Sequence, residues 1–183
     1  MSAAVRIEAI LRRDRRRWDI LGMVAGLGLP DCWIAAGFVR NAVWDDMHGR
    51  PAAPPKGDID VIWFDRERCD PATDRALELA LRSIDGAIDW SVKNQARMHR
   101  RNGDAPYRSA TDAMRYWPET ATAVAARRIG GDRCEIASPL GLDDLLAGIV
   151  RPGPAFETAK RPVFEERLRK KNWLAEWPKL RRA

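Results

Sequence analysis

The chain has 183 residues, 45% of them hydrophobic and 32% charged, a size and composition typical of one globular domain with its own core. It carries no apolar run of about 18 residues, which excludes a transmembrane helix, and its three cysteines are too scattered for a disulfide framework or a zinc site. The net charge of +6 weakly favours polyanionic partners such as nucleotides or RNA, and the arginine-rich start without an apolar signal core predicts a cytoplasmic protein.

The first half of the chain alternates helical patterns with short apolar runs. Apolar residues at near-helical spacing predict an N-terminal helix over about 3–27, and a buried strand follows over 32–36. A second helical pattern covers 39–48, and proline and glycine make 49–57 a loop. Residues 58–64 form the clearest strand, because they are rich in β-branched and aromatic side chains.

The second half mixes strands and helices in the same way. Its predicted elements are a helix over 71–84, a strand over 87–94, helices and loops over 95–116, a hairpin of strands 120–129 and 134–137, a helix over 141–150, and a basic helical tail over about 160–183. Strands interleaved with helices predict an α/β or α+β fold, with a mixed sheet flanked by helices. We expect one domain over residues 1–183.

Two acids stand two residues apart in the clearest strand. Asp58 and Asp60 project to the same side of that strand, whereas Ile59 and Val61 face the core. Close carboxylates raise each other's pKa unless a cation lies between them, and hard oxygen ligands beside a phosphate suit Mg²⁺. The pair is therefore a candidate catalytic site that holds Mg²⁺. The alternative is an exposed strand edge with two aspartates, which is a common arrangement.

A glycine turn precedes this pair, at the junction between the predicted strand 32–36 and the next helix. We expect Gly37 to adopt a backbone conformation closed to other residues and to let a phosphate approach closely. The helix after it would direct free N–H groups toward that anion. Gly37, Phe38, Arg40 and Asn41 are therefore nucleotide-binding candidates. Arg40 would serve either as an anion ligand or as a clamp on Asp58.

The glycine turn followed by Asp-x-Asp resembles the nucleotidyltransferase superfamily, and this resemblance implies a third metal-binding acid from a neighbouring strand. In the strand predicted over 87–94, Asp89, Ser91 and Lys93 share one face, and Asp89 is its only acid, so we nominate it as the third catalytic and metal-binding carboxylate. If the register instead places Ser91 opposite the pair, the third ligand is missing. Lys93 and Arg97 would face a triphosphate or an acidic acceptor; the alternative is surface charge beside a helix capped by Asn94.

Two other kinds of residue remain candidates. Glu119 is either a structural hydrogen-bond acceptor or a catalytic group, and the structural role is the better interpretation. The tryptophans are expected in the core, with base stacking as the alternative for Trp44, Trp63 and Trp117.

The stretch Ala36-Gly37-Phe38-Val39-Arg40-Asn41, followed by a helix and Asp58-Ile59-Asp60, resembles the head of the CCA-adding and bacterial poly(A) polymerase branch of the nucleotidyltransferase superfamily. That pattern runs Gly-Gly-x-Val-Arg-Asp, a helix, then Asp-x-Asp. Here Ala36 replaces the first glycine, Asn41 replaces the closing acid, and the connection to Asp58 is about two helical turns longer. These departures and the chain length argue against a tRNA-tailing enzyme.

The segments 90–99, 117–124 and 139–145 are similar to a smaller bacterial family of nucleotidyltransferase-like proteins whose substrate is unassigned. This resemblance implies the polymerase beta-like nucleotidyltransferase fold. It also implies transfer of a nucleoside monophosphate from a nucleoside triphosphate such as ATP to an unknown acceptor hydroxyl, with two Mg²⁺ ions.

Two alternatives to that enzyme stay open. One is a catalytically impaired module of the same fold that binds nucleotide, RNA or a protein partner through basic surface at 12–17 and in the C-terminal helix. The other is a regulatory or toxin-like transferase that modifies a protein.

Overall fold

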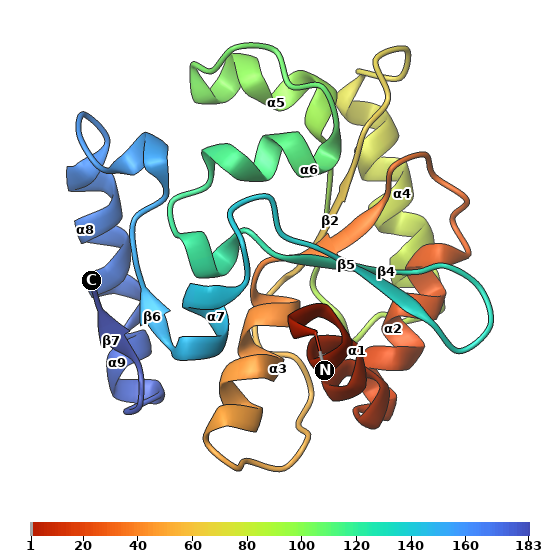
Figure 1. Ribbon diagram of the computed structural model, residues 1–183. Coiled ribbons are helices and arrows are strands. Elements are labelled where there is room, and N and C mark those ends of the chain that lie inside the picture. Colours follow the sequence, from red (N-terminus) through yellow and green to blue (C-terminus); the bar gives the residue numbers. More distant parts are fainter. Residues whose placement is uncertain (1) are drawn as a thin grey trace.

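The computed structural model describes residues 2–183 and is built around a five-stranded mixed sheet (Figure 1). The strand order is β3-β2-β1-β4-β5; β2 and β3 are parallel, and the other neighbours are antiparallel. The strands are β1 (Trp33–Ala35), β2 (Ile59–Trp63), β3 (Trp90–Asn94), β4 (Ala125–Arg128) and β5 (Cys134–Ala137). The mixed sheet flanked by helices and the β4–β5 hairpin confirm the predicted fold class.

The N-terminal helix predicted as one element consists of two helices, α1 (Ala3–Arg13) and α2 (Arg15–Ala25). Asp14 separates them with an extended backbone, and its carboxylate accepts a hydrogen bond from the Arg17 backbone N–H at 3.0 Å. The same carboxylate forms an ion pair with the buried Arg17 guanidinium. The helix breaks here because Asp14 caps α2 and neutralises a buried charge at once.

The remaining helices are short except for α3, α4 and α8. They are α3 (Gly37–Met47), α4 (Pro71–Ile84), α5 (Gln95–Asn102), α6 (Ala110–Ala113), the 3₁₀ turns η1 (Met114–Tyr116), η2 (Thr120–Thr122) and η3 (Pro154–Phe156), α7 (Asp143–Ala147), α8 (Arg161–Lys171) and α9 (Trp173–Glu176). None of the helices within residues 2–183 combines the length and the apolar character needed to cross a membrane.

Several predicted elements are shorter than expected: the strand predicted over 87–94 spans only Trp90–Asn94, and the helical tail predicted over about 160–183 ends at Glu176. The strand predicted over 120–129 begins with the turn η2, so only its second half pairs in the sheet. The helix predicted over 141–150 ends at Gly148, whose φ of 67° is left-handed. A two-residue strand, β6 (Ile149–Val150), then pairs with β7 (Arg181–Arg182) near the C-terminus. Glycine ends the helix because it adopts this conformation without steric cost.

The two faces of the sheet have different environments. One face carries the large core, to which α1, α2, α3 and α4 contribute, and Ile59, Val61 and Val92 are buried there. On the other face, Ile62 belongs to a smaller cluster that includes Ala110 of α6 and Met114 of η1. In Figure 1, α5 and α6 lie on one side of the sheet, and α1 and α3 lie on the other. Because side chains alternate along a strand, Asp60 shares the second, less covered face with Ile62.

The C-terminal segment packs back onto α3. Trp173 and Trp177 contact Trp44 edge to face, with ring centroids 5.7 and 5.3 Å apart. The Trp177 indole N–H also donates to Asp45 at 2.8 Å. Aromatic contacts of this kind hold the last helices, drawn in blue in Figure 1, against α3.

Candidate active site

The two aspartates of the Asp-x-Asp strand line one cavity. Asp60 is partly buried on the second face of β2, and Asp58 is exposed just before the strand. Within residues 2–183 neither carboxylate accepts a hydrogen bond or forms an ion pair. Burial and the neighbouring Asp58 raise the pKa of Asp60 to about 6, although Arg167 and Arg40 oppose the shift. The pair is therefore an electrostatically unsatisfied oxygen donor set.

The register of β2 and β3 places a serine beside this pair. Ser91 is the Cα partner of Asp60, and both side chains line a second cavity. Asp89 precedes β3; its carboxylate is 73% exposed and lies 3.4 Å from Arg82 of α4. Within the described residues no three acidic, histidine or cysteine side chains group closely enough to hold a metal ion. The structure thus does not bring Asp89 to Asp58 and Asp60.

The unusual backbone at the strand–helix junction belongs to Ala36, not to Gly37 as expected from the sequence. Ala36 has φ 55° and ψ −124°, whereas Gly37 is the first residue of α3 and does not have a positive φ. A Cβ on Gly37 would lie 3.4 Å from the Arg40 guanidinium, which is ordinary van der Waals contact, so neither the backbone nor the available space requires glycine here. The expectation was wrong because the chain turns at the residue before the glycine.

The first two residues of α3 have backbone donors without a partner. The N–H groups of Val39 and Arg40 bond to the Ala36 carbonyl, at 3.2 and 2.9 Å. Those of Gly37 and Phe38 have no partner among the described residues. The Phe38 side chain is only 2% exposed and belongs to the core, so this residue can meet a ligand only through its backbone. Free N–H groups at a helix start attract anions.

Arg40 and Asn41 are buried beside the cavity. The Arg40 guanidinium donates to Asn41 Oδ1 at 2.9 Å and to Thr122 Oγ1 at 2.9 Å. It stacks on Trp44 and Trp173, with distances of 5.0 and 4.2 Å to the ring centroids. Burial lowers the pKa of Arg40 to about 10. Because its hydrogen bonds go to Asn41 and Thr122, Arg40 forms no clamp on Asp58.

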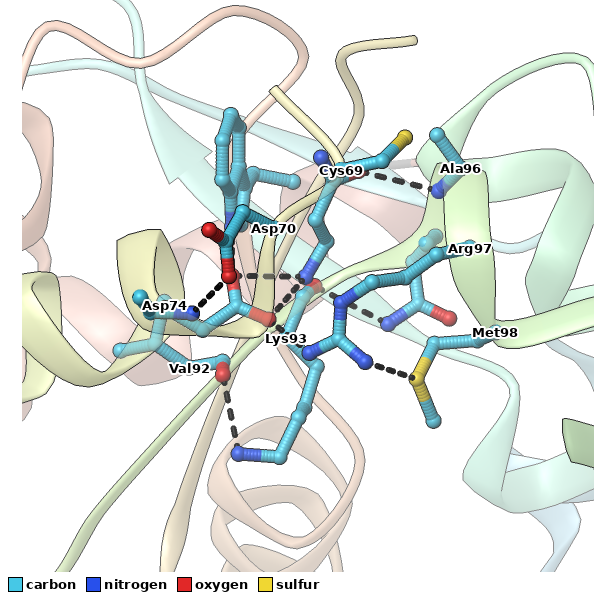
Figure 2. A network of polar contacts seen from close by, with 12 residues as sticks. Cys69, Asp70, Asp74, Val92, Lys93, Ala96, Arg97 and Met98 are labelled. Carbon is cyan, nitrogen blue, oxygen red and sulfur yellow. Dashed lines mark hydrogen bonds and ion pairs between the residues drawn. The ribbon is translucent and has the colours of Figure 1, made fainter. Parts of the chain in front are cut away.

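The two predicted phosphate-facing cations of the β3–α5 segment are already paired. Lys93 lies 2.8 Å from Glu78 of α4 and also lines the second cavity. Figure 2 shows Arg97 extending from α5 to Asp74 of α4, with which it forms an ion pair. Asp74 is 2% exposed, so Arg97 neutralises a buried carboxylate. Lys93 therefore remains near the site, whereas Arg97 is occupied in the interior.

Two cavities meet at Asp60. The first, which we call the phosphate-side cavity, has a volume of about 240 Å³ and contains both aspartates, Gly37, and the basic residues Arg167 and Lys171 of α8. The second cavity also measures about 240 Å³, shares Asp60 and Arg167, and is otherwise more apolar, with Trp117 in its wall. Phosphates suit the first cavity, because it offers positive charge and the unpaired N–H of Gly37.

Some residues around these cavities were not found from the sequence. Arg167 and Lys171 lie more than a hundred residues after Asp60, in a helix whose basic pattern resembles a solvated surface.

Among the tryptophans considered for base stacking, Trp44 and Trp63 are 0% exposed, and Trp117 alone lines a described cavity. Glu119 is buried and accepts a hydrogen bond from Arg167 at 2.7 Å.

A mixed sheet that carries Asp-x-Asp beside the exposed start of a helix is the architecture of nucleotidyltransferases. A family model described as "Nucleotidyltransferase" matches residues 22–182, and the chain belongs to this family. No curated protein matches the chain. A solved structure described as revealing a CCA-adding enzyme head domain is 36% identical, with a TM-score of 0.85; the match covers 97% of this chain and 94% of the other.

More distant solved structures share the fold. One described as a tRNA-processing enzyme in its apo form I is 18% identical, with a TM-score of 0.56, and the match covers 100% of this chain and 45% of that one. Another, described as tRNA-processing enzyme complex 3, is 16% identical, with a TM-score of 0.57 and coverage of 90% and 43%. This chain therefore spans less than half of either enzyme.

Proposed function

We propose that this chain transfers a nucleoside monophosphate from a nucleoside triphosphate to an acceptor hydroxyl, and that Asp58 and Asp60 hold Mg²⁺ for this reaction. The observation that carries the proposal is the pair of unpartnered carboxylates in one cavity with Gly37, whose backbone N–H has no partner among the described residues. Membership of the nucleotidyltransferase family supports the same reaction class.

The donor set fits a hard divalent cation. Asp58 and Asp60 offer carboxylate oxygens only, and the raised pKa of Asp60 means that the folded chain resists carrying both negative charges without a counter-ion. Mg²⁺ prefers such oxygens, keeps several waters, and needs few protein ligands. When bound, it would neutralise phosphate charge and make the acceptor hydroxyl more acidic.

The chain's own residues would orient the two substrates. The N–H group of Gly37 would bind a phosphate oxygen in the phosphate-side cavity, and the acceptor would enter through the second cavity beside Ser91. The acceptor oxygen then forms a bond to the α-phosphorus as the bond from that phosphorus to the bridging oxygen breaks. Pyrophosphate leaves, and the hydroxyl proton passes to water. In-line geometry of this kind would follow from placing the α-phosphate near Asp60.

A second candidate function is nucleotide binding without turnover. The observation in its favour is Ser91, which stands beside Asp60 where Asp89 had been expected to complete a set of three acids. A site with two carboxylates can hold a metal–nucleotide complex and still lack the ligand that turnover needs.

Calorimetry with Mg²⁺ and a non-hydrolysable ATP analogue tests the proposal. We expect the wild type to bind, and Asp58→Asn and Asp60→Asn to bind roughly tenfold more weakly or worse. Asp89→Asn is the matched control, because that carboxylate is exposed and paired with Arg82. No binding by the wild type at millimolar nucleotide would remove the proposal.

A turnover assay separates the two candidate functions. Release of pyrophosphate from a labelled nucleoside triphosphate, lost in Asp60→Asn, supports the transferase. Binding without pyrophosphate release, when pooled small molecules, RNA and protein are each offered as acceptors, supports the second candidate.

A further inference from the structure

One wall of the phosphate-side cavity is formed by the C-terminal helix α8, far from Asp58 and Asp60 in the sequence. Arg167 and Lys171 lie four residues apart, so they share one side of this helix. Both line the cavity, and Arg167 lines the second cavity as well. α8 therefore brings two cations to the point where the two cavities meet.

Arg167 is held in a fixed orientation. Its Nε donates to Glu119 Oε1 at 2.7 Å, and its guanidinium carbon lies 5.6 Å from the centroid of the Trp173 ring. The two terminal nitrogens form no hydrogen bond with any residue in 2–183. A guanidinium fixed at Nε with two free NH₂ groups is prepared to bind an oxyanion in a forked geometry.

Glu119 is energetically unfavourable at this buried position. It is 1% exposed, and its second oxygen, Oε2, is buried without a hydrogen-bond partner. An isolated buried carboxylate is unfavourable, so the ion pair with Arg167 is its main compensation. The pair fixes Arg167 instead of leaving the guanidinium free to turn into solvent.

Of the two cations, Lys171 has no ion-pair partner among the described residues, and Arg167 keeps two free terminal nitrogens beside its pair with Glu119. Lys56 and Glu176 neutralise each other at 2.7 Å. Arg167 and Lys171 then face Asp58 and Asp60, which have no ion-pair partner within the described residues. A divalent cation on the aspartates would free the positive charge of α8 for a second anion.

We propose that Arg167 and Lys171 bind the phosphate chain of the nucleoside triphosphate and that Glu119 is the positioning residue of Arg167. This inference rests on the proposed function and adds the C-terminal helix to its substrate site. Binding of triphosphate therefore requires α8, although the Asp-x-Asp strand and the α3 start lie in the first third of the chain.

Two adjacent lysines provide a matched test. Lys171 lines the cavity, whereas Lys170 points its ammonium at Glu166, 2.6 Å away on the surface of the same helix. We expect Lys171→Gln to weaken binding of a non-hydrolysable ATP analogue with Mg²⁺ by roughly tenfold, and Lys170→Gln to leave it unchanged. The loss should be smaller for ADP and smallest for AMP, because fewer phosphates reach α8.

A second pair of variants tests the role of Glu119. Arg167→Gln should weaken triphosphate binding by roughly tenfold or more, and Arg167→Lys, which keeps the charge but loses the fork, should recover part of it. Glu119→Gln should weaken ATP-analogue binding more than AMP binding, a dependence on phosphate number that a general loss of stability does not produce. If Glu119→Gln does not fold, the lysine comparison decides alone.

The outcomes separate this inference from the proposed function. If the wild type binds and Lys171→Gln equals Lys170→Gln, α8 is not a phosphate ligand, and the proposed function stands without it. If Lys171→Gln weakens binding of an RNA oligonucleotide but not of the ATP analogue, α8 serves an acceptor, and the inference is wrong. If the wild type binds no triphosphate, both proposals fall together.

Discussion

Asp60 on β2 and Ser91 on β3 are register partners in the parallel pair, and both side chains line the second cavity. The hydroxyl of Ser91 thus occupies the position nearest to Asp60 on the neighbouring strand. Asp89, two residues earlier, faces Arg82 and solvent instead. The composition of this site depends on the register of two strands.

Substitution of Ser91 by aspartate should complete a set of three carboxylates. We expect Ser91→Asp to raise the affinity for Mg²⁺ by roughly tenfold, because each added carboxylate strengthens a hard-cation site. Isothermal titration calorimetry with Mg²⁺ measures this affinity directly. Asp89→Asn should leave the affinity unchanged; a fall equal to that of Asp60→Asn would mean that Asp89 reaches the metal after all.

The raised pKa of Asp60 predicts a pH-dependent cost to stability. The pKa rises from an ordinary value of 3.8, which applies to the unfolded chain, to about 6 in the folded chain. Between these values the unfolded chain has released a proton that the folded chain keeps, so the free energy of unfolding falls as pH rises through this window. Without divalent cations, Asp60→Asn should be more stable than the wild type by about 3 kcal/mol at pH 7, and the difference should vanish below about pH 4.

Urea denaturation from pH 3.5 to 8 checks this expectation. Millimolar Mg²⁺ should stabilise the wild type at pH 7 and not the variant, since the cation needs the charged pair. If the free energies of unfolding of the wild type and Asp60→Asn change with pH in parallel, a raised pKa of Asp60 is contradicted.

The left-handed backbone at Ala36 predicts that glycine is the better residue there. Ala36 has φ 55° and ψ −124°, a conformation that costs an L-residue of order 1–3 kcal/mol. Ala36→Gly should raise the free energy of unfolding by about 1 kcal/mol, after the entropy lost by glycine is subtracted. Ala35→Gly in β1, at a buried site without a positive φ, should instead destabilise by about 1 kcal/mol. Destabilisation by both variants would show that Ala36 is not strained.

The buried carboxylate of Asp74 predicts a large stability effect away from the cavities. It accepts hydrogen bonds from the Trp63 indole N–H at 2.8 Å and from the Asn94 backbone N–H at 3.1 Å, and it pairs with Arg97. Asp74→Ala should lower the free energy of unfolding by about 3–5 kcal/mol, because these donors would be left buried and unpaired.

The matched control for this variant is Asp70→Ala. Asp70 only caps α4 through the Ala72 N–H at 2.8 Å, so its loss should cost about 1 kcal/mol. Urea unfolding of the two variants compares them. Equal effects would mean that the Asp74 network is as dispensable as a surface cap.

Local patterns predicted much of the fold. The strand around Asp60 and the hairpin of β4 and β5 follow from alternation, β-branched residues and a glycine turn, which act within a few residues. The same patterns missed the break at Asp14, where the carboxylate pairs with the buried Arg17. The spacing of apolar residues within a few turns does not show that a charged side chain will be buried.

The sequence by itself indicated the family, the Asp58–Asp60 pair at the start of one strand, and a helix beside the Ala36–Gly37 junction, since each is a short motif whose geometry follows from the backbone. Only the tertiary structure decided that Ser91 stands beside Asp60, that Arg97 turns to Asp74, and that α8 returns to the phosphate-side cavity. These outcomes depend on strand register and on packing between segments far apart in the chain, where many arrangements bury similar apolar area and only the complete core selects one.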